Sequence, residues 1–362
     1  MFAKIISAIE PLDTAAMEAC QLRLDNLTKP LGSLHGLENL ARKMAGITRS
    51  PKPKNLGKSI ILMAADHGVA HEGVSAYPPE VTRQMLRNIA RGGAAINVLA
   101  RHVHAELVAV DVGVAGDLSD LPEIRRAKIA WGTKNITLGP AMTHREMQKA
   151  VETGIRVAAE QIDKGCKIIG LGDMGIGNTT PSSAIVTLYD GGEPAKLAGR
   201  GTGISDGILK HKIAVIQQAL AVNKPCAAEP LDVLAKIGGL EIAGLTGVIL
   251  GAAAGRAAVV IDGIVAGAAA LIAVKLAPPA REYLIGSHYS REPAQRRALE
   301  LIGLPAYLHM DMRLGEGTGA ALGIILIDAA LQVLNDMKTF GEAAVAVAED
   351  GLGAGRQRLD VF

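Results

Sequence analysis

The residue best placed to do chemistry is Glu316, in the stretch Arg313–Leu322, RLGEGTGAAL. This single carboxylate lies between two glycines, and the apolar run AALGIILIDAAL follows it. Glycines allow a ligand to approach the backbone closely, and an apolar helix behind the carboxylate would keep the site dry. Burial raises a carboxylate pKa and a helix N-terminus lowers it. We interpret Glu316 as a general base; the alternative is a helix-terminal carboxylate that only complements the helix dipole.

A glycine-rich loop, GLGDMGIGNTTPSSA (Gly170–Ala184), is the best candidate for binding a phosphate. The apolar run KIIGL predicts a strand that leads into the glycines, and Pro181 would open a helix with Thr180 as its N-cap. Exposed N–H groups and the dipole at such a helix N-terminus favour an anion.

The same loop contains the pattern GxGxxG at Gly170, Gly172 and Gly175, which is found in dinucleotide-binding folds. The pattern lies in the middle of the chain, and no acidic residue follows it at the end of a second strand. A dinucleotide site is therefore the weaker interpretation, and a purely structural turn is the other alternative.

Two further segments carry polar side chains. ADHGVAHEG offers Asp66, His67, His71 and Glu72 as metal ligands, but a glycine and a strand end disfavour a helical histidine pair, so we favour structural or substrate-orienting roles. The segment GRGTGISDGILKHK (199–212) combines a second flexible turn with Lys210, His211 and Lys212. These cations either form a solvated helix face or include one lysine that pairs with a phosphate.

The elements that must position these residues alternate between strands and helices. Short apolar runs ending in Gly, Asp or His predict strands within Ser59–Gly68, Ala105–Val114, Cys166–Gly175, Ala257–Gly263 and Tyr307–Gly317. Helical patterns such as Arg145–Lys164 and Lys212–Val222 lie between them. This alternation predicts an α/β fold with a mostly parallel sheet covered by helices on both faces, and ligands at the carboxyl ends of its strands.

The first 50 residues are instead helical and charged, without a clear strand. We expect residues 1–50 to form a small helical domain, joined by C-terminal helices at about 336–362. The segment SPKPKN (50–55) would link it to a large α/β domain at 56–335.

Composition excludes several classes of protein. Of 362 residues, 38 are Lys or Arg and 36 are Asp or Glu, and aromatic residues are only 2%, which argues against nucleic acid and membrane surfaces as partners. Three cysteines without a CxxC pair indicate a reducing cytoplasm and neither a disulfide framework nor a cysteine-rich metal site.

The N-terminal apolar run is too short for a secretory signal. The apolar region 242–274 is interrupted by Arg256 and Asp262, so it predicts buried Gly/Ala-rich helices, since a membrane span needs about 20 residues.

Taken together, the segments LDNLTKPLGSL, ADHGVAHEGVSAYP, GLGDMGIGNTTPSSA, KIGGLEIAGLTGVILGAA and YLHMDMRLGEGTGAAL resemble the nicotinate-nucleotide–dimethylbenzimidazole phosphoribosyltransferases of cobalamin biosynthesis. The resemblance covers nearly the whole chain. It implies transfer of the phosphoribosyl group of nicotinate mononucleotide to a benzimidazole, with no metal and no cofactor. It also implies a Rossmann-like large domain, a small helical domain, and a homodimer whose partner subunit helps complete each active site.

The resemblance also implies site residues. Glu316 matches the proposed base. Phosphoribosyl- or nucleotide-binding positions would be Asp173, Gly175, Ile176, Gly177, Asn178, Thr179, Thr202, Gly203, Lys212 and Ser290, and base-binding positions Tyr77, Met85, Leu314 and Gly315. Some members have a serine and a glutamine in place of Tyr77 and Met85, and a glutamate in place of Asp173. The preferred base therefore stays open among dimethylbenzimidazole, other benzimidazoles, purines and phenolics.

Three other hypotheses compete with this one. An NAD-dependent oxidoreductase would use the GxGxxG loop and bind NADH. A metal-dependent hydrolase would use Asp66, His67 and His71. A non-catalytic regulator would bind nicotinate mononucleotide without converting it.

Overall fold

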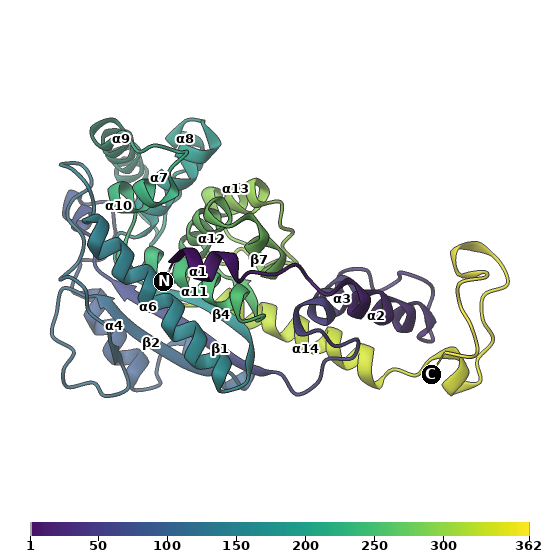
Figure 1. Cartoon of the computed structure of the whole chain (residues 1–362). Helices are drawn as coiled ribbons and strands as arrows, with labels where there is room; N and C mark the ends of the chain where they lie inside the picture. Colours follow the sequence, from purple (N-terminus) through teal and green to yellow (C-terminus); the bar gives the residue numbers. More distant parts are fainter. Residues whose placement is uncertain (1, 362) are drawn as a thin grey trace.

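A six-stranded parallel sheet forms the centre of the computed structural model, which describes residues 2–361 (Figure 1). Its strand order is β3-β2-β1-β4-β5-β6, and every neighbouring pair is parallel. The strands are β1 (Gly57–Ala65), β2 (Glu106–Gly113), β3 (Arg125–Arg126), β4 (Cys166–Met174), β5 (Ala258–Ile261) and β6 (Leu284–Gly286). The order reverses between β1 and β4, which is where sheets of this type bind ligands. The predicted Rossmann-like α/β class is confirmed.

Helices surround this sheet. Their bounds are α1 Phe2–Ser7, α2 Thr14–Asn26, α3 Gly36–Thr48, α4 Val81–Ala90, α5 Ala95–His102, α6 His144–Asp163, α7 Thr179–Asp190, α8 Pro194–Leu197, α9 Asp206–Asn223, α10 Pro230–Ile237, α11 Leu240–Ala254, α12 Ile264–Leu276, α13 Pro293–Ile302, α14 Thr318–Asp336 and α15 Phe340–Ala343. Three 3-10 helices add Gly68–Glu72, Pro278–Tyr283 and Gly351–Gly353.

The helices cover both faces of the sheet, as side-chain alternation along β1 shows. Ile60 and Met63 are an odd number of positions apart, so they point to opposite faces. Met63 contacts Gly244 of α11, whereas Ile60 lies beside Gly170 of β4 on the face covered by Ala320 of α14. Helices α11 and α14 therefore enclose the sheet from its two sides.

Helices α6 and α11 pack unusually closely because glycines line their contact. A Cβ atom added to Gly154 of α6 would lie 1.8 Å from the carbonyl oxygen of Gly244, and one added to Gly247 of α11 would lie 2.0 Å from that of Val151. The two backbones are therefore in direct contact. This explains the Gly/Ala-rich composition of α11, which is buried along almost its whole length, as predicted.

Within residues 2–361 one helix, α14, is long and apolar enough to cross a membrane, and 56% of its apolar window is buried inside the protein. The helix packs against β4, β5 and α3. It thus has the position of a core helix, and α11 and α12 are shorter.

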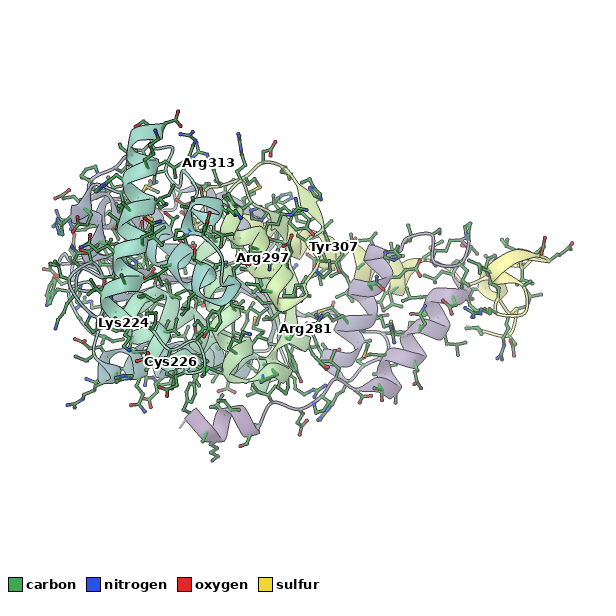
Figure 2. The ribbon with its side chains drawn as sticks, turned by 90° about the horizontal axis from the view of Figure 1, so that it is seen from above. Lys224, Cys226, Arg281, Arg297, Tyr307 and Arg313 are labelled. Carbon is green, nitrogen blue, oxygen red and sulfur yellow. The ribbon has the colours of Figure 1, made fainter. Side chains whose placement is uncertain are left out.

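Helices α2 and α3 and the segment after α14 lie together and project from the α/β body, whereas α1 packs on the body against α11 (Figures 1 and 2). Leu27 pairs with Thr339, and Arg23 donates hydrogen bonds to the carbonyl oxygens of Leu334 and Met337. The start of α3 also lies against the body, where the ring of Tyr307 (labelled in Figure 2) comes within 3.3 Å of the position that a Cβ on residue 36 would take. Beyond α14 the described C-terminal segment has only short helices. The division into two domains stays a prediction.

One predicted strand is wrong. Only Leu308–His309 (β8) of the segment 307–317 is extended, and it pairs with His288–Tyr289 (β7) in a separate two-stranded sheet. The rest cannot form a strand because Asp311 and residues 315–317 have left-handed backbone conformations. The predicted strands supply four of the six strands of the main sheet; the short strands β3 and β6 were not predicted.

Candidate active site

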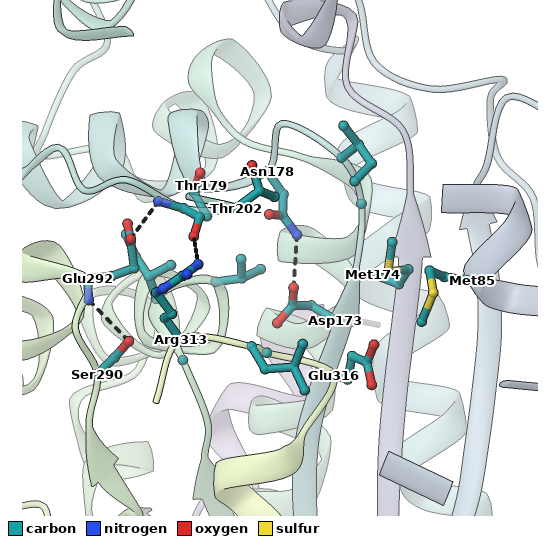
Figure 3. A pocket seen from close by; sticks show the side chains of 18 of the residues that line it. Met85, Asp173, Met174, Asn178, Thr179, Thr202, Ser290, Glu292, Arg313 and Glu316 are labelled. Carbon is teal, nitrogen blue, oxygen red and sulfur yellow. Dashed lines mark hydrogen bonds between the residues drawn. The ribbon is translucent and has the colours of Figure 1, made fainter. Parts of the chain in front are cut away.

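A cavity of about 660 Å³ opens at the carboxyl ends of the central strands (Figure 3). It brings together twelve of the predicted site residues, namely Tyr77, Met85, Asp173, Gly175, Ile176, Asn178, Thr179, Thr202, Ser290, Leu314, Gly315 and Glu316. Gly177, Gly203 and Lys212, also predicted, do not line it. Residues from five separate parts of the chain thus meet at one place, although their roles stay predictions.

Glu316 enters the cavity from a turn with an uncommon backbone. Gly315, Glu316 and Gly317 have φ angles of 84°, 60° and 92°, so three consecutive residues are left-handed. The turn lies directly on β4 at Gly172, where an added Cβ would be 2.6 Å from the carbonyl oxygen of Glu316. Gly172 is therefore required for this close approach and not for a dinucleotide fingerprint.

The Glu316 side chain is 5% exposed, and within residues 2–361 its Oε2 has no hydrogen-bond partner. Burial raises the pKa of this carboxyl, and the negative charge of Asp262 adds to the rise, whereas the backbone N–H of Ile96 opposes it. A buried carboxylate with a raised pKa in a residue that lines a cavity is suited to accept a proton.

Asp173, at the end of β4, is one of two further carboxyls that line the cavity, and Glu292 is the other. It accepts a hydrogen bond of 2.8 Å from Nδ2 of Asn178. Burial raises the pKa of Asp173 to about 8, and the charges of Asp262 and Glu241 contribute to the shift. Asp173 is therefore mainly protonated at neutral pH, and Glu292 accepts from the Gly201 N–H, so Glu316 is the best suited of the three to act as a base.

This shift has a consequence for stability. Since the folded pKa of Asp173 is above its unfolded value, folding binds a proton, and the stability that this contributes is lost as pH rises from about 4 to about 8. We expect Asp173→Asn, which keeps an acceptor for Asn178, to be more stable than wild type above pH 7. The difference should grow by roughly 1.4 kcal/mol per pH unit across this window.

Thermal unfolding at several pH values measures this difference, with Asp163→Asn at the exposed end of α6 as the control. A stability difference independent of pH would contradict the raised pKa of Asp173.

The glycine loop leads into α7, but the predicted cap is wrong. The helix begins at Thr179 and its N-cap position is Asn178, so Thr180 and Pro181 lie inside the first turn. The chain is already turning at Gly175, whose carbonyl oxygen accepts from the N–H of Asn178. Because the Asn178 side chain bonds to Asp173, it does not cap the helix, and the N-terminus of α7 faces the cavity without that cap.

Lys212 is fully buried behind the cavity wall. Its Nζ donates to Oγ1 of Thr179 at 2.8 Å and to the carbonyl oxygen of Gly199 at 3.1 Å. Burial lowers the pKa of Lys212 to about 8. The lysine therefore contacts Thr179 and Gly199 and does not line the cavity itself. Of its neighbours, Lys210 is exposed and His211 bonds to the carbonyl oxygen of Glu72.

Three polar cavity residues were missed by the sequence analysis: Arg313, Glu292 and His288. Arg313 Nη1 donates to the carbonyl oxygen of Gly201 at 2.8 Å, and Glu292 Oε1 accepts from the Gly201 N–H at 2.7 Å (Figure 3). Both side chains hold the 199–203 turn against the cavity. Arg313 was detectable as part of the RLGEG motif, whereas Glu292 and His288 had no local signal.

The candidate metal ligands have other partners. His67 Nε2 lies 2.7 Å from Oε1 of Glu241, and both side chains are buried. Asp66 accepts from the N–H of Ala115, and His71 lies exposed on a 3-10 helix. Within residues 2–361 no three His, Cys, Asp or Glu side chains converge as metal ligands would. These contacts favour the structural role for His67.

Comparison with known proteins agrees with this architecture. A phosphoribosyltransferase family profile matches residues 9–345. Proteins named nicotinate-nucleotide–dimethylbenzimidazole phosphoribosyltransferase from Chloroflexus aggregans and from Roseiflexus are each 52% identical over 346 residues, covering 96% of this chain and 98% of theirs. The crystal structure of CobT from Thermus thermophilus superposes with a TM-score of 0.88 at 41% identity, covering 92% of this chain and 99% of that one.

The match extends over almost the full length of both partners, so it includes the sheet, the glycine loop and the Glu316 turn together. The chain therefore belongs to the nicotinate-nucleotide–dimethylbenzimidazole phosphoribosyltransferase family.

Proposed function

We propose that this enzyme transfers the phosphoribosyl group of nicotinate mononucleotide to dimethylbenzimidazole, giving α-ribazole 5′-phosphate and nicotinate, in assembly of the cobalamin nucleotide loop. The observation that carries the proposal is the position of Glu316. This buried carboxylate, with a raised pKa and a free oxygen, shares one cavity with a glycine loop that opens a helix. The names of the relatives support the choice of substrates.

The chemistry needs one base and little else. The ring nitrogen of nicotinate mononucleotide carries a positive charge, so the bond from C1′ to that nitrogen breaks with its electron pair going to the ring, which becomes neutral. A benzimidazole nitrogen attacks C1′ from the opposite face and forms the new C–N bond. The resulting benzimidazolium loses its remaining N–H proton to Glu316, and a neutral α-linked base results. Electrons, charge and the proton are all accounted for.

The opposite end of the cavity suits the phosphate. The N-terminus of α7 and the N–H groups of the glycine loop would bind the 5′-phosphate, as helix N-termini do for anions. Lys212 would act from behind Thr179, whose hydroxyl it already contacts. Ser290 and Thr202 lie on the same rim and would contact the ribose. With the phosphate fixed, C1′ is held at a set distance from Glu316, and orientation supplies much of the rate.

The base would lie against apolar side chains near Glu316. Met85, Met174 and Leu314 line this part of the cavity, and Tyr77 lies at its edge with 54% of its surface exposed. Thioethers and aliphatic groups fit the faces of a flat aromatic ring. Without a polar side chain such as glutamine at residue 85, the site would favour an apolar benzimidazole over a purine.

We also propose a homodimer in which the partner subunit covers the cavity. Two large apolar residues that line it are well exposed, Leu314 at 58% and Tyr77 at 54%. Apolar groups gathered at the edge of a site are typical of an interface. Light scattering after size-exclusion chromatography gives the mass directly, and a monomeric mass near 37.5 kDa would contradict the dimer.

The test is a direct reaction. Purified enzyme is mixed with nicotinate mononucleotide and dimethylbenzimidazole without added metal, and both products are followed by chromatography. We expect nicotinate and α-ribazole 5′-phosphate in equal amounts. Nicotinate without ribazole phosphate would indicate a hydrolase, and binding of the nucleotide without any product, with purine and phenolic bases also supplied, would indicate the non-catalytic regulator. Saturable NADH binding would favour the oxidoreductase.

A further inference from the structure

Asp262 is a buried carboxylate behind the Glu316 turn. It follows β5 directly and is 1% exposed, yet it does not line the cavity. Its Oδ2 accepts a 2.9 Å hydrogen bond from the Gly317 N–H, and its Oδ1 accepts one of 2.7 Å from the Gly319 N–H. A third and longer bond of 3.3 Å comes from Ala320. One carboxylate thus binds the first turn of α14, immediately after Glu316.

The segment that Asp262 binds is the one least able to keep its shape unaided. Residues 315–317 are all left-handed, and Glu316, with φ 60°, has a Cβ that makes this conformation unfavourable. A non-glycine residue remains in it only when surrounding contacts hold it there. Gly172 leaves room on β4 for the carbonyl of Glu316, and Asp262 on the neighbouring strand β5 receives the next N–H.

We propose that Asp262 is a positioning residue for catalysis, because it holds the left-handed Gly315–Gly317 turn and thereby aims the Glu316 carboxylate into the cavity. This inference rests on the proposed function, in which Glu316 is the base. An aspartate suits the task because its two oxygens, on a short side chain, can accept from Gly317 and Gly319 at the same time.

His288 packs at the same point. A Cβ on residue 319 would lie 2.1 Å from Nδ1 of His288 and 2.7 Å from Oδ1 of Asp262, so the imidazole and the carboxylate crowd one glycine. The same Nδ1 lies 2.9 Å from Oγ of Ser287, which donates to the carbonyl oxygen of Ile261. A side chain at residue 319 would therefore displace both the imidazole and the Asp262 carboxylate.

The titratable groups that face Asp262 are His288 of β7, Asp173 of β4 and Glu316. Glu241 of α11 acts on Asp173 in the same direction as Asp262. Burial raises the pKa of Asp262 itself, and His288 and the N–H groups of Gly317, Gly319 and Ala320 oppose the rise. Burial is the main cause of the raised pKa of Glu316, and the ionised form of Asp262 adds to it. Replacing Asp262 by asparagine removes this charge and should move the acid limb of the kcat–pH profile to lower pH. An ordinary helix cap that affected stability alone would not move it.

The test compares Asp262→Asn and Asp262→Glu with wild type in the phosphoribosyl-transfer assay. In Asp262→Asn an amide NH₂ replaces one carboxylate oxygen, so one of the N–H groups of Gly317 and Gly319 loses its hydrogen-bond acceptor. We expect kcat to fall roughly 10- to 100-fold while KM for nicotinate mononucleotide changes less than about twofold, because the base is displaced and the phosphate site is not. Asp262→Glu keeps the charge, so it should lower kcat without shifting the acid limb.

A double-mutant cycle shows whether Asp262 acts through Glu316. In a Glu316→Gln background, Asp262→Asn should cause no further loss of kcat. A full additional loss would overturn the proposal. Asp111→Asn is the control, since Asp111 is also buried and also accepts from a backbone N–H beyond a strand, that of Val114, although it pairs with Lys128 as well and lies away from the cavity. It should leave the pH profile unchanged.

Failure of this inference and failure of the proposed function can be distinguished. Wild-type enzyme without transfer activity would contradict the function. A slow Glu316→Gln with a normal Asp262→Asn would contradict only the role of Asp262. If neither Asp262 variant folds, hydrogen exchange on wild-type enzyme still decides. The Gly317 and Gly319 amides should exchange more slowly than the Leu314 amide, and fast exchange at both would overturn the proposal.

Discussion

Replacing Glu316 by glutamine is expected to lower turnover by roughly 10²- to 10⁴-fold, the usual contribution of a positioned general base. Glutamine has nearly the same shape and can still be buried, but it cannot accept the benzimidazole proton. Since Glu316 is not among the groups proposed to bind the phosphate, the Kd for nicotinate mononucleotide should stay within about threefold of wild type. Steady-state kinetics and nucleotide binding by calorimetry measure the two effects separately.

Glu193→Gln, an exposed carboxylate before α8, is the control for this substitution and should behave as wild type. Turnover close to wild type in Glu316→Gln would remove this residue from the mechanism. In that case Asp173 would be the next candidate for the base, despite its being mainly protonated at neutral pH.

Gly154→Ala is expected to destabilise the fold by roughly 3–5 kcal/mol, among the larger effects of a single substitution. The added methyl would lie 1.8 Å from the carbonyl oxygen of Gly244, which is backbone and cannot rotate away. Helices α6 and α11 would have to separate, and α11 also packs against β1 and β2. Chemical denaturation followed by circular dichroism measures the change in the free energy of unfolding.

Gly207→Ala controls for the replacement itself. Gly207 lies in the first turn of α9 and is exposed, and an added Cβ there would come no closer than 3.9 Å to another atom. Alanine at that position should be neutral or stabilise by about 0.5 kcal/mol, because it restricts the unfolded chain. Equal behaviour of the two variants would mean that the α6–α11 contact can relax, contrary to its backbone-to-backbone geometry.

The sequence predicted the sheet well where strands were long and apolar. Parallel strands that are buried on both faces consist almost entirely of apolar residues. Apolar runs such as KIIGL are therefore sufficient to identify them. The prediction of a strand at 307–317 was wrong because the apolar start of this segment continues into residues with left-handed backbone. Nothing in side-chain polarity reports this conformation, and only the spaced glycines hinted at it.

The site residues that could be predicted are those that lie within a single sequence motif. Glu316 and the glycine loop are each contained in one motif, and both line the cavity. Lys212 was expected at the cavity, but its position depends on how α9 packs behind α7, which places it against Thr179 instead. Glu292 and Asp262 act on segments 91 and 55 residues away in the chain, so no local pattern could connect them with their partners.

The hydrogen bonds that Asp262 accepts also make two parts of the cavity wall different in their attraction for an anion. Two helices, α7 and α14, begin at this wall, and each N-terminus would attract an anion. At α14 that attraction is already satisfied by a carboxylate of the protein, whereas at α7 the N-cap side chain is turned away to Asp173. Under the proposed function, the 5′-phosphate of nicotinate mononucleotide would therefore bind at α7 and not at α14. The sugar would then present the same face to the incoming base in every turnover.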